Sequence, residues 1–91
     1  MDSENYFVYV ISSEVANKFY VGMSADPQIR LKQHNSGHSQ FTKGFRPWKL
    51  VYSELAGSRE NARELEKYYK TGAGRKRWIK IIEDQNLSPD Y

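Results

Sequence analysis

Residues 6–22, YFVYVISSEVANKFYVG, decide the fold of this chain. Tyrosine, valine and isoleucine dominate two alternating stretches, residues 6–12 and 18–23, and this pattern is typical of half-buried strands. The polar stretch from Ser12 to Asn17 between them carries turn-forming side chains. The pattern therefore predicts an antiparallel hairpin at the start of the chain.

A helix is predicted directly after the hairpin. Asp26 can cap the free amides of a first turn, and Pro27 is tolerated at the first helical position because its missing N–H has no partner there. We expect this helix to run to about Asn35 and to end near Gly37. Residues 37–46 are polar and have no clear period, so they predict a loop.

A third strand and two more helices complete the predicted fold. Residues 48–54 alternate, which predicts a strand with Trp48, Leu50 and Tyr52 on one face. Ser58 is a suitable N-cap for the second helix. The apolar stripe of that helix consists of Ala62, Leu65 and Tyr69. The segment Gly72-Ala73-Gly74 is expected to break the helix, and a third helix is expected from Arg75 to about Gln85. The predicted class is α/β of the α+β type: a three-stranded antiparallel sheet flanked by three helices, in the order β-β-α-β-α-α.

Length and composition indicate one small, cysteine-free domain. The 91 residues predict a single domain, 1–91, with a core at about 6–82 and a frayed tail at 86–91. The chain has no cysteine, which excludes disulfides and cysteine-based metal sites and is compatible with a reducing cytoplasm. The longest apolar run, Tyr6 to Ile11, is far too short to span a membrane. We therefore expect a soluble cytoplasmic protein without a membrane partner, whose oligomeric state the sequence does not give.

The distribution of charge points to one basic segment. The net charge is only +3, but residues 30–49 contain basic residues and no acidic one. These basic residues are Arg30, Lys32, Lys43, Arg46 and Lys49. The segment is a candidate phosphate-facing surface, and the alternative is the ordinary solvated surface of a basic protein.

Two strand tyrosines and two helical side chains are the first candidates for chemistry. Tyr9 and Tyr20 each have the pattern of an ordinary half-buried strand tyrosine. Together with Gly22 and Arg30, however, they could converge at one end of the sheet. Arg30 and His34 are four residues apart and share a helix face, where the guanidinium could hold a phosphate through two parallel hydrogen bonds.

Glu66 is the candidate metal ligand. It lies at the edge of the second helix's apolar stripe, where Lys70 could form an ordinary ion pair with it. A lone carboxylate can also anchor Mg²⁺, because that ion keeps several waters and takes further oxygens from a substrate phosphate. The chain has no HExxH zinc pattern, no Gly-x-Ser-x-Gly elbow and no Gly-x-x-x-x-Gly-Lys phosphate loop.

Taken in order, these residues resemble the GIY-YIG nuclease superfamily over about residues 6–82. The two triplets that name the family are matched by Val8-Tyr9-Val10 and Tyr20-Val21-Gly22, and Arg30 follows on the first helix. Later segments are similar to the small single-domain bacterial group related to the excision-repair nuclease subunit. They are His34-Asn35-Ser36-Gly37, Thr42-Lys43, Arg46 to Tyr52, and Ala62 with Glu66 and Lys70.

The resemblance implies a divalent-metal-dependent endonuclease that hydrolyses phosphodiester bonds in DNA, with branched or damaged DNA and DNA repair as its setting. It implies that Glu66 binds one ion, Mg²⁺ or Mn²⁺, and that Arg30 stabilises the charge on the reacting phosphate. Tyr9 or Tyr20 would deprotonate the attacking water, and His34 would position it or take a proton; the residues alone leave the choice of phenol open. The implied DNA contacts are Lys32, Lys43, Arg46, Lys49 and Lys70.

Two positions depart from the family pattern. In the first triplet Val8 stands where glycine names the family and Val10 stands at the end, while Tyr9 is kept. Met23 stands where some relatives carry a lysine. These changes, with Phe41 and Phe45 interleaved in the basic segment, keep an alternative open: a noncatalytic nucleic-acid-binding module with a degenerate nuclease site.

Overall fold

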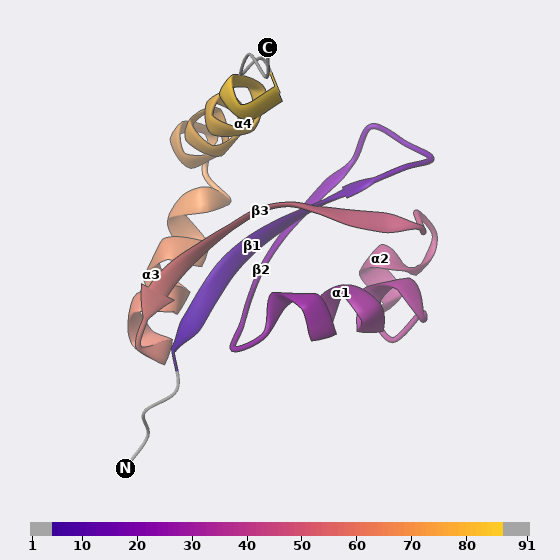
Figure 1. The fold of residues 1–91 in the computed structure, drawn as a ribbon, viewed down its shortest axis with the longest axis horizontal. Helices are drawn as coiled ribbons and strands as arrows, with labels where there is room; N and C mark the ends of the chain where they lie inside the picture. The colour runs from indigo at the N-terminus through magenta and orange to yellow at the C-terminus, as the bar shows by residue number, and fades with distance from the viewer. Residues whose placement is uncertain (1–4, 87–91) are drawn as a thin grey trace.

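A computed structural model of the chain describes residues 5–86. The elements, in order, are β1 (Tyr6–Ser13), β2 (Phe19–Ser24), α1 (Pro27–Asn35), α2 (Gln40–Lys43), β3 (Trp48–Gly57), α3 (Arg59–Tyr69) and α4 (Gly72–Asn86) (Figure 1). The three strands form one antiparallel sheet in the order β2-β1-β3. The predicted α+β fold and its opening hairpin are confirmed. Apart from Asn86, the tail predicted to be frayed lies outside the described residues.

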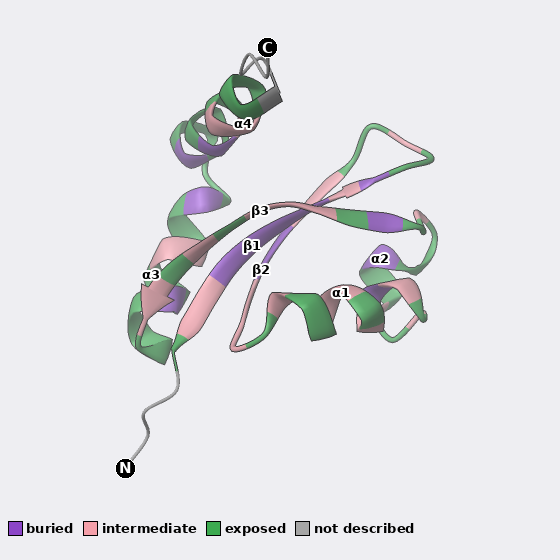
Figure 2. Ribbon diagram, viewed as in Figure 1, coloured by how far each residue is buried: buried purple, intermediate pink, exposed green. Residues whose placement is uncertain are grey.

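The sheet is the middle of three layers, with α1 and α2 on one face and α3 and α4 on the other (Figure 1). β1 is the central strand, and burial is concentrated along it (Figure 2). Because successive strand residues point to opposite faces, Val8 and Val10 pack toward α3 and α4, while Tyr9 and Ile11 pack toward α1. A chain of this length thus builds two small cores on one strand.

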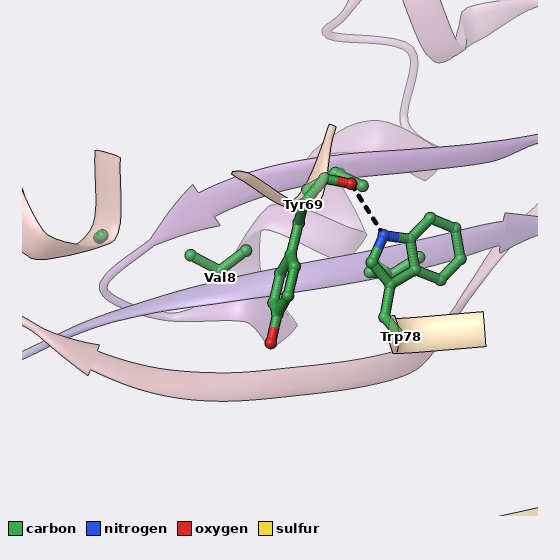
Figure 3. Packing of buried hydrophobic residues seen from close by; sticks show 6 residues of the cluster. Val8, Tyr69 and Trp78 are labelled. Atoms are coloured by element: carbon green, nitrogen blue, oxygen red, sulfur yellow. Dashed lines mark hydrogen bonds between the residues drawn. The ribbon is translucent and has the colours of Figure 1, made fainter. Parts of the chain in front are cut away.

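Trp78 is the centre of the core under α3 and α4. It packs with Val8 and Tyr69, and its indole Nε1 donates a hydrogen bond to the backbone oxygen of Tyr69 at 2.9 Å (Figure 3). This bond joins α4 to the last residue of α3, so the two helices are held as a unit against the sheet.

The prediction that Trp48, Leu50 and Tyr52 share one face of β3 was wrong. Val10 pairs with Tyr52 but Ile11 pairs with Leu50, so Val51 is an extra residue that bulges from β3. The bulge turns Tyr52 toward the α3 side, while Leu50 and Trp48 stay on the α1 side.

Helix boundaries were predicted well where a capping side chain marks them. Asp26 accepts hydrogen bonds from two amides at the start of α1, and Ser58 accepts one at the start of α3, as expected. The segment 37–46, predicted as a loop, contains the short helix α2. α4 begins at Gly72 rather than at Arg75, so the glycine pair lies inside the helix instead of breaking it. Within the described residues, no helix is long and apolar enough to cross a membrane.

Candidate active site

The site is organised around the hydroxyl of Tyr9, on the α1 face of the central strand. Gly22 of β2 is paired with Tyr9 and is itself buried. A Cβ atom at position 22 would lie 2.5 Å from the Tyr9 hydroxyl oxygen and 3.1 Å from Cε2 of Tyr20. Because Gly22 has no side chain, the Tyr9 ring can extend over β2 toward the outer edge of the sheet.

His34 of α1 is buried against both tyrosines. Its Nε2 lies 3.0 Å from the Tyr9 hydroxyl, and its Nδ1 lies 2.9 Å from Oγ1 of Thr42. The ring of Tyr20 meets the imidazole edge-on, with the ring centroids 4.9 Å apart. The two helical turns between Asp26 and His34 thus bring the imidazole to the strand tyrosines.

Thr42 is a site residue that the sequence did not reveal. It lies in α2, is 1% exposed and supplies the second hydrogen bond of His34. The segment around it has no period, and Thr42 was noted only with Lys43 in the family resemblance, which gave it no role. Asn35 was also missed; it exchanges two hydrogen bonds with the backbone of Trp48 and fixes the end of α1 on β3.

His34 is neutral at physiological pH. Burial, and then the charge of Arg30, lower the pKa of His34 from 6.5 to about 4. A neutral imidazole has one N–H donor and one acceptor nitrogen. If Nδ1–H donates to Thr42, Nε2 is free to accept a hydrogen bond from the Tyr9 hydroxyl, because both hydroxyl partners can donate or accept.

The lowered pKa of His34 predicts acid-sensitive stability. The unfolded chain protonates His34 below about pH 6.5 and the folded chain only below about pH 4, so stability falls as the pH falls through this window. We expect His34 to account for about 2 kcal/mol of lost stability between about pH 7 and pH 4.5. Urea denaturation at the two pH values measures this loss.

His34→Gln should remove that part of the pH dependence, and His38→Gln is the matched control because His38 is exposed. An unchanged pH dependence in His34→Gln would contradict the buried neutral imidazole.

Arg30 and Glu66 both act on the Tyr9 hydroxyl. Burial raises the pKa of Tyr9, whereas hydrogen bonding and charge from Arg30 lower it, and the charges of Tyr20 and Glu66 raise it again. These opposing effects place all three side chains within electrostatic range of one phenol. Arg30 also donates a hydrogen bond to Oε1 of Gln33, which orients its guanidinium.

Glu66 reaches the site from the opposite layer. It lies on α3, and the residues that follow it, Tyr69 and Lys70, border β2 beside Tyr20. Its Oε2 lies 3.2 Å from Nζ of Lys70, and its side chain is 20% exposed. The carboxylate is therefore accessible from solvent at the outer edge of the sheet.

The donor set at Glu66 fits an ion that is held mainly by water and substrate. Residues 5–86 contain no cluster of three or more His, Cys, Asp or Glu side chains that could enclose a metal. Mg²⁺ commonly uses one or two carboxylates together with waters and substrate phosphate oxygens. A single accessible carboxylate meets that requirement, and Lys70 is the side chain with which an ion would compete.

The predicted DNA contacts fall into three places. Lys32 of α1, Lys43 of α2 and Arg46 are exposed on the α1–α2 layer, where Arg46 Nε donates to the backbone oxygen of Lys43 at 2.9 Å. Lys49 is exposed on β3 and follows Trp48, whose side chain is buried on the α1 face, so Lys49 points to the opposite face. Lys70 stands beside Glu66. The structure therefore brings Lys43 and Arg46 together, places Lys32 on the same layer and leaves Lys49 apart.

The two residues that depart from the family pattern belong to the core. Val8 is fully buried on the α3–α4 face, and Met23, its partner in the β1–β2 ladder, packs against the same cluster. Neither side chain lies between Tyr9 and His34. The substitutions thus fill the core behind the strand and leave the tyrosine face unobstructed.

Residues 5–80 match the family model described as the GIY-YIG catalytic domain. This chain belongs to the GIY-YIG family. GIY-YIG proteins are nucleases that generally depend on a divalent metal, and their domain implies a DNA substrate.

Small bacterial GIY-YIG proteins resemble the whole chain. The UPF0213 protein YazA of Bacillus subtilis (strain 168) is 32% identical over 87 residues, which cover 94% of this chain and 87% of YazA. The solution structure of the UPF0213 protein BH0048 from Bacillus halodurans is 26% identical, with a TM-score of 0.51 over 85% of this chain and 84% of that protein. A shorter match, 43% identical over 53 residues, covers 50% of this chain and 16% of the structure-specific endonuclease subunit SLX1 of Scheffersomyces stipitis.

Proposed function

We propose that this chain is a divalent-metal-dependent endonuclease that hydrolyses phosphodiester bonds in DNA. The observation that carries the proposal is the surroundings of the Tyr9 hydroxyl. This hydroxyl is hydrogen-bonded to the neutral His34, and the charges of the Arg30 guanidinium and the Glu66 carboxylate both act on it. A proton acceptor, a phosphate-binding cation and a metal-binding carboxylate are the groups that phosphodiester hydrolysis needs.

Arg30 is suited to hold the scissile phosphate. Its guanidinium offers several donors in one plane, which match two phosphate oxygens and stay charged at every relevant pH. Because it lies beside Tyr9, a phosphate bound there would present its phosphorus close to the phenol. Arg30 would then stabilise the extra negative charge that develops during attack.

We assign to Tyr9 the role of the base that accepts a proton from the attacking water. A phenol with a pKa of about 10 is a poor base near neutral pH, and burial raises the pKa of Tyr9 further. Hydrogen bonding and charge from Arg30 oppose this rise, and a divalent ion at Glu66 would add further positive charge, which favours a phenol that has lost its proton to solvent and can take one from water. The hydrogen bond to His34 Nε2 would hold the Tyr9 hydroxyl in place. The contact between His34 Nδ1 and Thr42 Oγ1 fixes the orientation of the imidazole, so that Nε2 stays at the Tyr9 hydroxyl. Tyr20 meets His34 only through its ring, which supports a positioning role for Tyr20.

Glu66 would hold the ion, Mg²⁺ or Mn²⁺. Such an ion neutralises charge on the phosphate oxygens and on the leaving oxygen. Lys70, which pairs with Glu66 in the absence of an ion, would then be available to contact a DNA phosphate. The exposed residues Lys32, Lys43 and Arg46 supply further contacts to the backbone.

Cleavage assays on labelled branched, nicked and duplex DNA test the proposal. We expect the purified chain to cleave in Mg²⁺ or Mn²⁺ and to be at least about 100-fold slower with chelator. Tyr9→Phe should lower the rate by about 100-fold or more, because general base catalysis typically contributes that much. Tyr20→Phe should cost less than about tenfold.

Tyr68→Phe is the matched control, because Tyr68 is an exposed tyrosine on α3. It lines a separate groove that is formed by residues of β3 and α3. Cleavage that survives the chelator would contradict the metal, and full activity in Tyr9→Phe would contradict the assignment of the base.

A noncatalytic DNA-binding module is the second candidate. The three exposed cations on the α1–α2 layer favour it as much as they favour a nuclease. It predicts binding that weakens steeply with salt, together with no ion-dependent cleavage of any DNA in the panel.

A further inference from the structure

A groove of about 390 Å³ runs along the outer edge of β2, beside the proposed active site. Its floor includes Phe19 and Tyr20 of β2. Its sides come from three helical segments: Phe41 of α2, Lys70 after α3, and Arg75 and Trp78 of α4. The volume falls within the range of about 300–1,000 Å³ that small-ligand sites occupy.

The lining combines aromatic rings with positive charge. Lys70 and Arg75 are its charged residues, and no acidic side chain is found among the described residues that line it. Arg75 lies over the rings of Phe19 and Trp78, at 5.6 and 5.5 Å from their centroids, so these two rings are already covered by a cation. The groove therefore matches a ligand that has both a flat apolar face and a negative charge.

Phe41 is the available ring. Its side chain is 82% exposed, the highest value among the large hydrophobic residues that are exposed in residues 5–86. Burial in the core does not explain a phenylalanine at this position. Exposed aromatic faces next to cations are the usual platform on which proteins stack the bases of single-stranded nucleic acid.

The groove and the proposed active site share residues. Tyr20 lines the groove and packs on His34, and Lys70 lines the groove and pairs with Glu66. A nucleotide next to the scissile phosphate could therefore enter the groove. In a duplex, neighbouring base pairs cover the face of each base, so only an unpaired base could stack on Phe41.

We propose that this groove binds one unpaired nucleobase next to the scissile phosphate, with the base on Phe41 and flanking phosphates on Lys70 and Arg75. The proposal rests on the proposed function and narrows its substrate to DNA that has a single-stranded segment at the point of cleavage. It assigns a role in substrate selection to Phe41, which lies outside the groups that perform the chemistry.

Binding measured without catalysis tests the groove. A fluorescein-labelled single-stranded oligonucleotide and its blunt duplex are titrated with the full chain in chelator, at one fixed salt concentration. We expect Phe41→Ala to weaken binding of the single strand by about tenfold and to change duplex binding by less than about twofold. Phe41→Trp should restore single-strand binding. Leu55→Ala is the matched control, because Leu55 is 57% exposed on β3, the opposite edge of the sheet.

The outcomes separate the two proposals. A loss confined to the single strand, absent in Leu55→Ala and reversed by tryptophan, supports the nucleobase groove. Equal losses for both probes, or none, overturn it, while ion-dependent cleavage by the same preparation would leave the nuclease proposal standing. If the wild-type chain binds neither probe and cleaves no DNA of the branched, nicked and duplex panel, the proposed function fails and the groove proposal fails with it.

Discussion

Glu66→Gln should reduce DNA cleavage at least roughly 1,000-fold, because an ion that neutralises the reacting phosphate contributes several kcal/mol to the rate. The substitution keeps the size of the side chain and removes the charge that would hold the ion. Only the surface ion pair with Lys70 is lost from the fold, which costs about 1 kcal/mol or less. Cleavage rates and calorimetric titration with Mn²⁺ measure the two effects separately.

Glu64→Gln is the control for that experiment. Glu64 lies on the same helix two residues earlier, is exposed, and lines a groove with Leu55 and Tyr68 on the side of β3. It should bind Mn²⁺ and cleave as the wild type does. If Glu66→Gln retained wild-type cleavage, the carboxylate would not be the metal ligand, whatever the effect of its charge on Tyr9.

Most of the fold follows from local signals in the sequence. The alternation around Tyr9 and Tyr20 predicted the hairpin, and the capping residues Asp26 and Ser58 predicted where α1 and α3 begin. The bulge at Val51 could not be predicted, because an extra residue in one strand is defined only against its partner β1. Periodicity describes one strand alone and therefore cannot reveal a shift in its pairing with another strand.

Part of the candidate site could likewise be predicted from local patterns in the sequence, and part of it could not. Arg30 and His34 were predicted to share a helix face, and the structure brings both to Tyr9. Thr42 was missed because its role depends on a short helix that packs against α1, a contact that no local pattern encodes. The choice between the two phenols likewise depends on the tertiary structure, because only the hydroxyl of Tyr9 contacts the imidazole nitrogen of His34.

The glycine pair after α3 shows how packing can reverse a sequence signal, and it gives the largest expected effect on stability. Gly74 lies in the first turn of α4, where a Cβ atom would be 2.0 Å from the backbone oxygen of Tyr68 and 2.7 Å from Cα of Tyr69. Both neighbours are backbone atoms, so they cannot rotate away. Gly74→Ala must push α4 off the end of α3, and with it the hydrogen bond from Trp78 to Tyr69.

We therefore expect Gly74→Ala to lower the free energy of unfolding by about 3 kcal/mol and Tm by roughly 15 °C, measured by urea and thermal denaturation. Gly72→Ala, two residues earlier in the same helix, has nothing within 4 Å of its added Cβ and should be neutral or slightly stabilising. Equal stability of the two variants would mean that α4 does not rest on the backbone of α3. The contrast between them isolates close helix packing from helix propensity, because both positions exchange the same glycine for the same alanine.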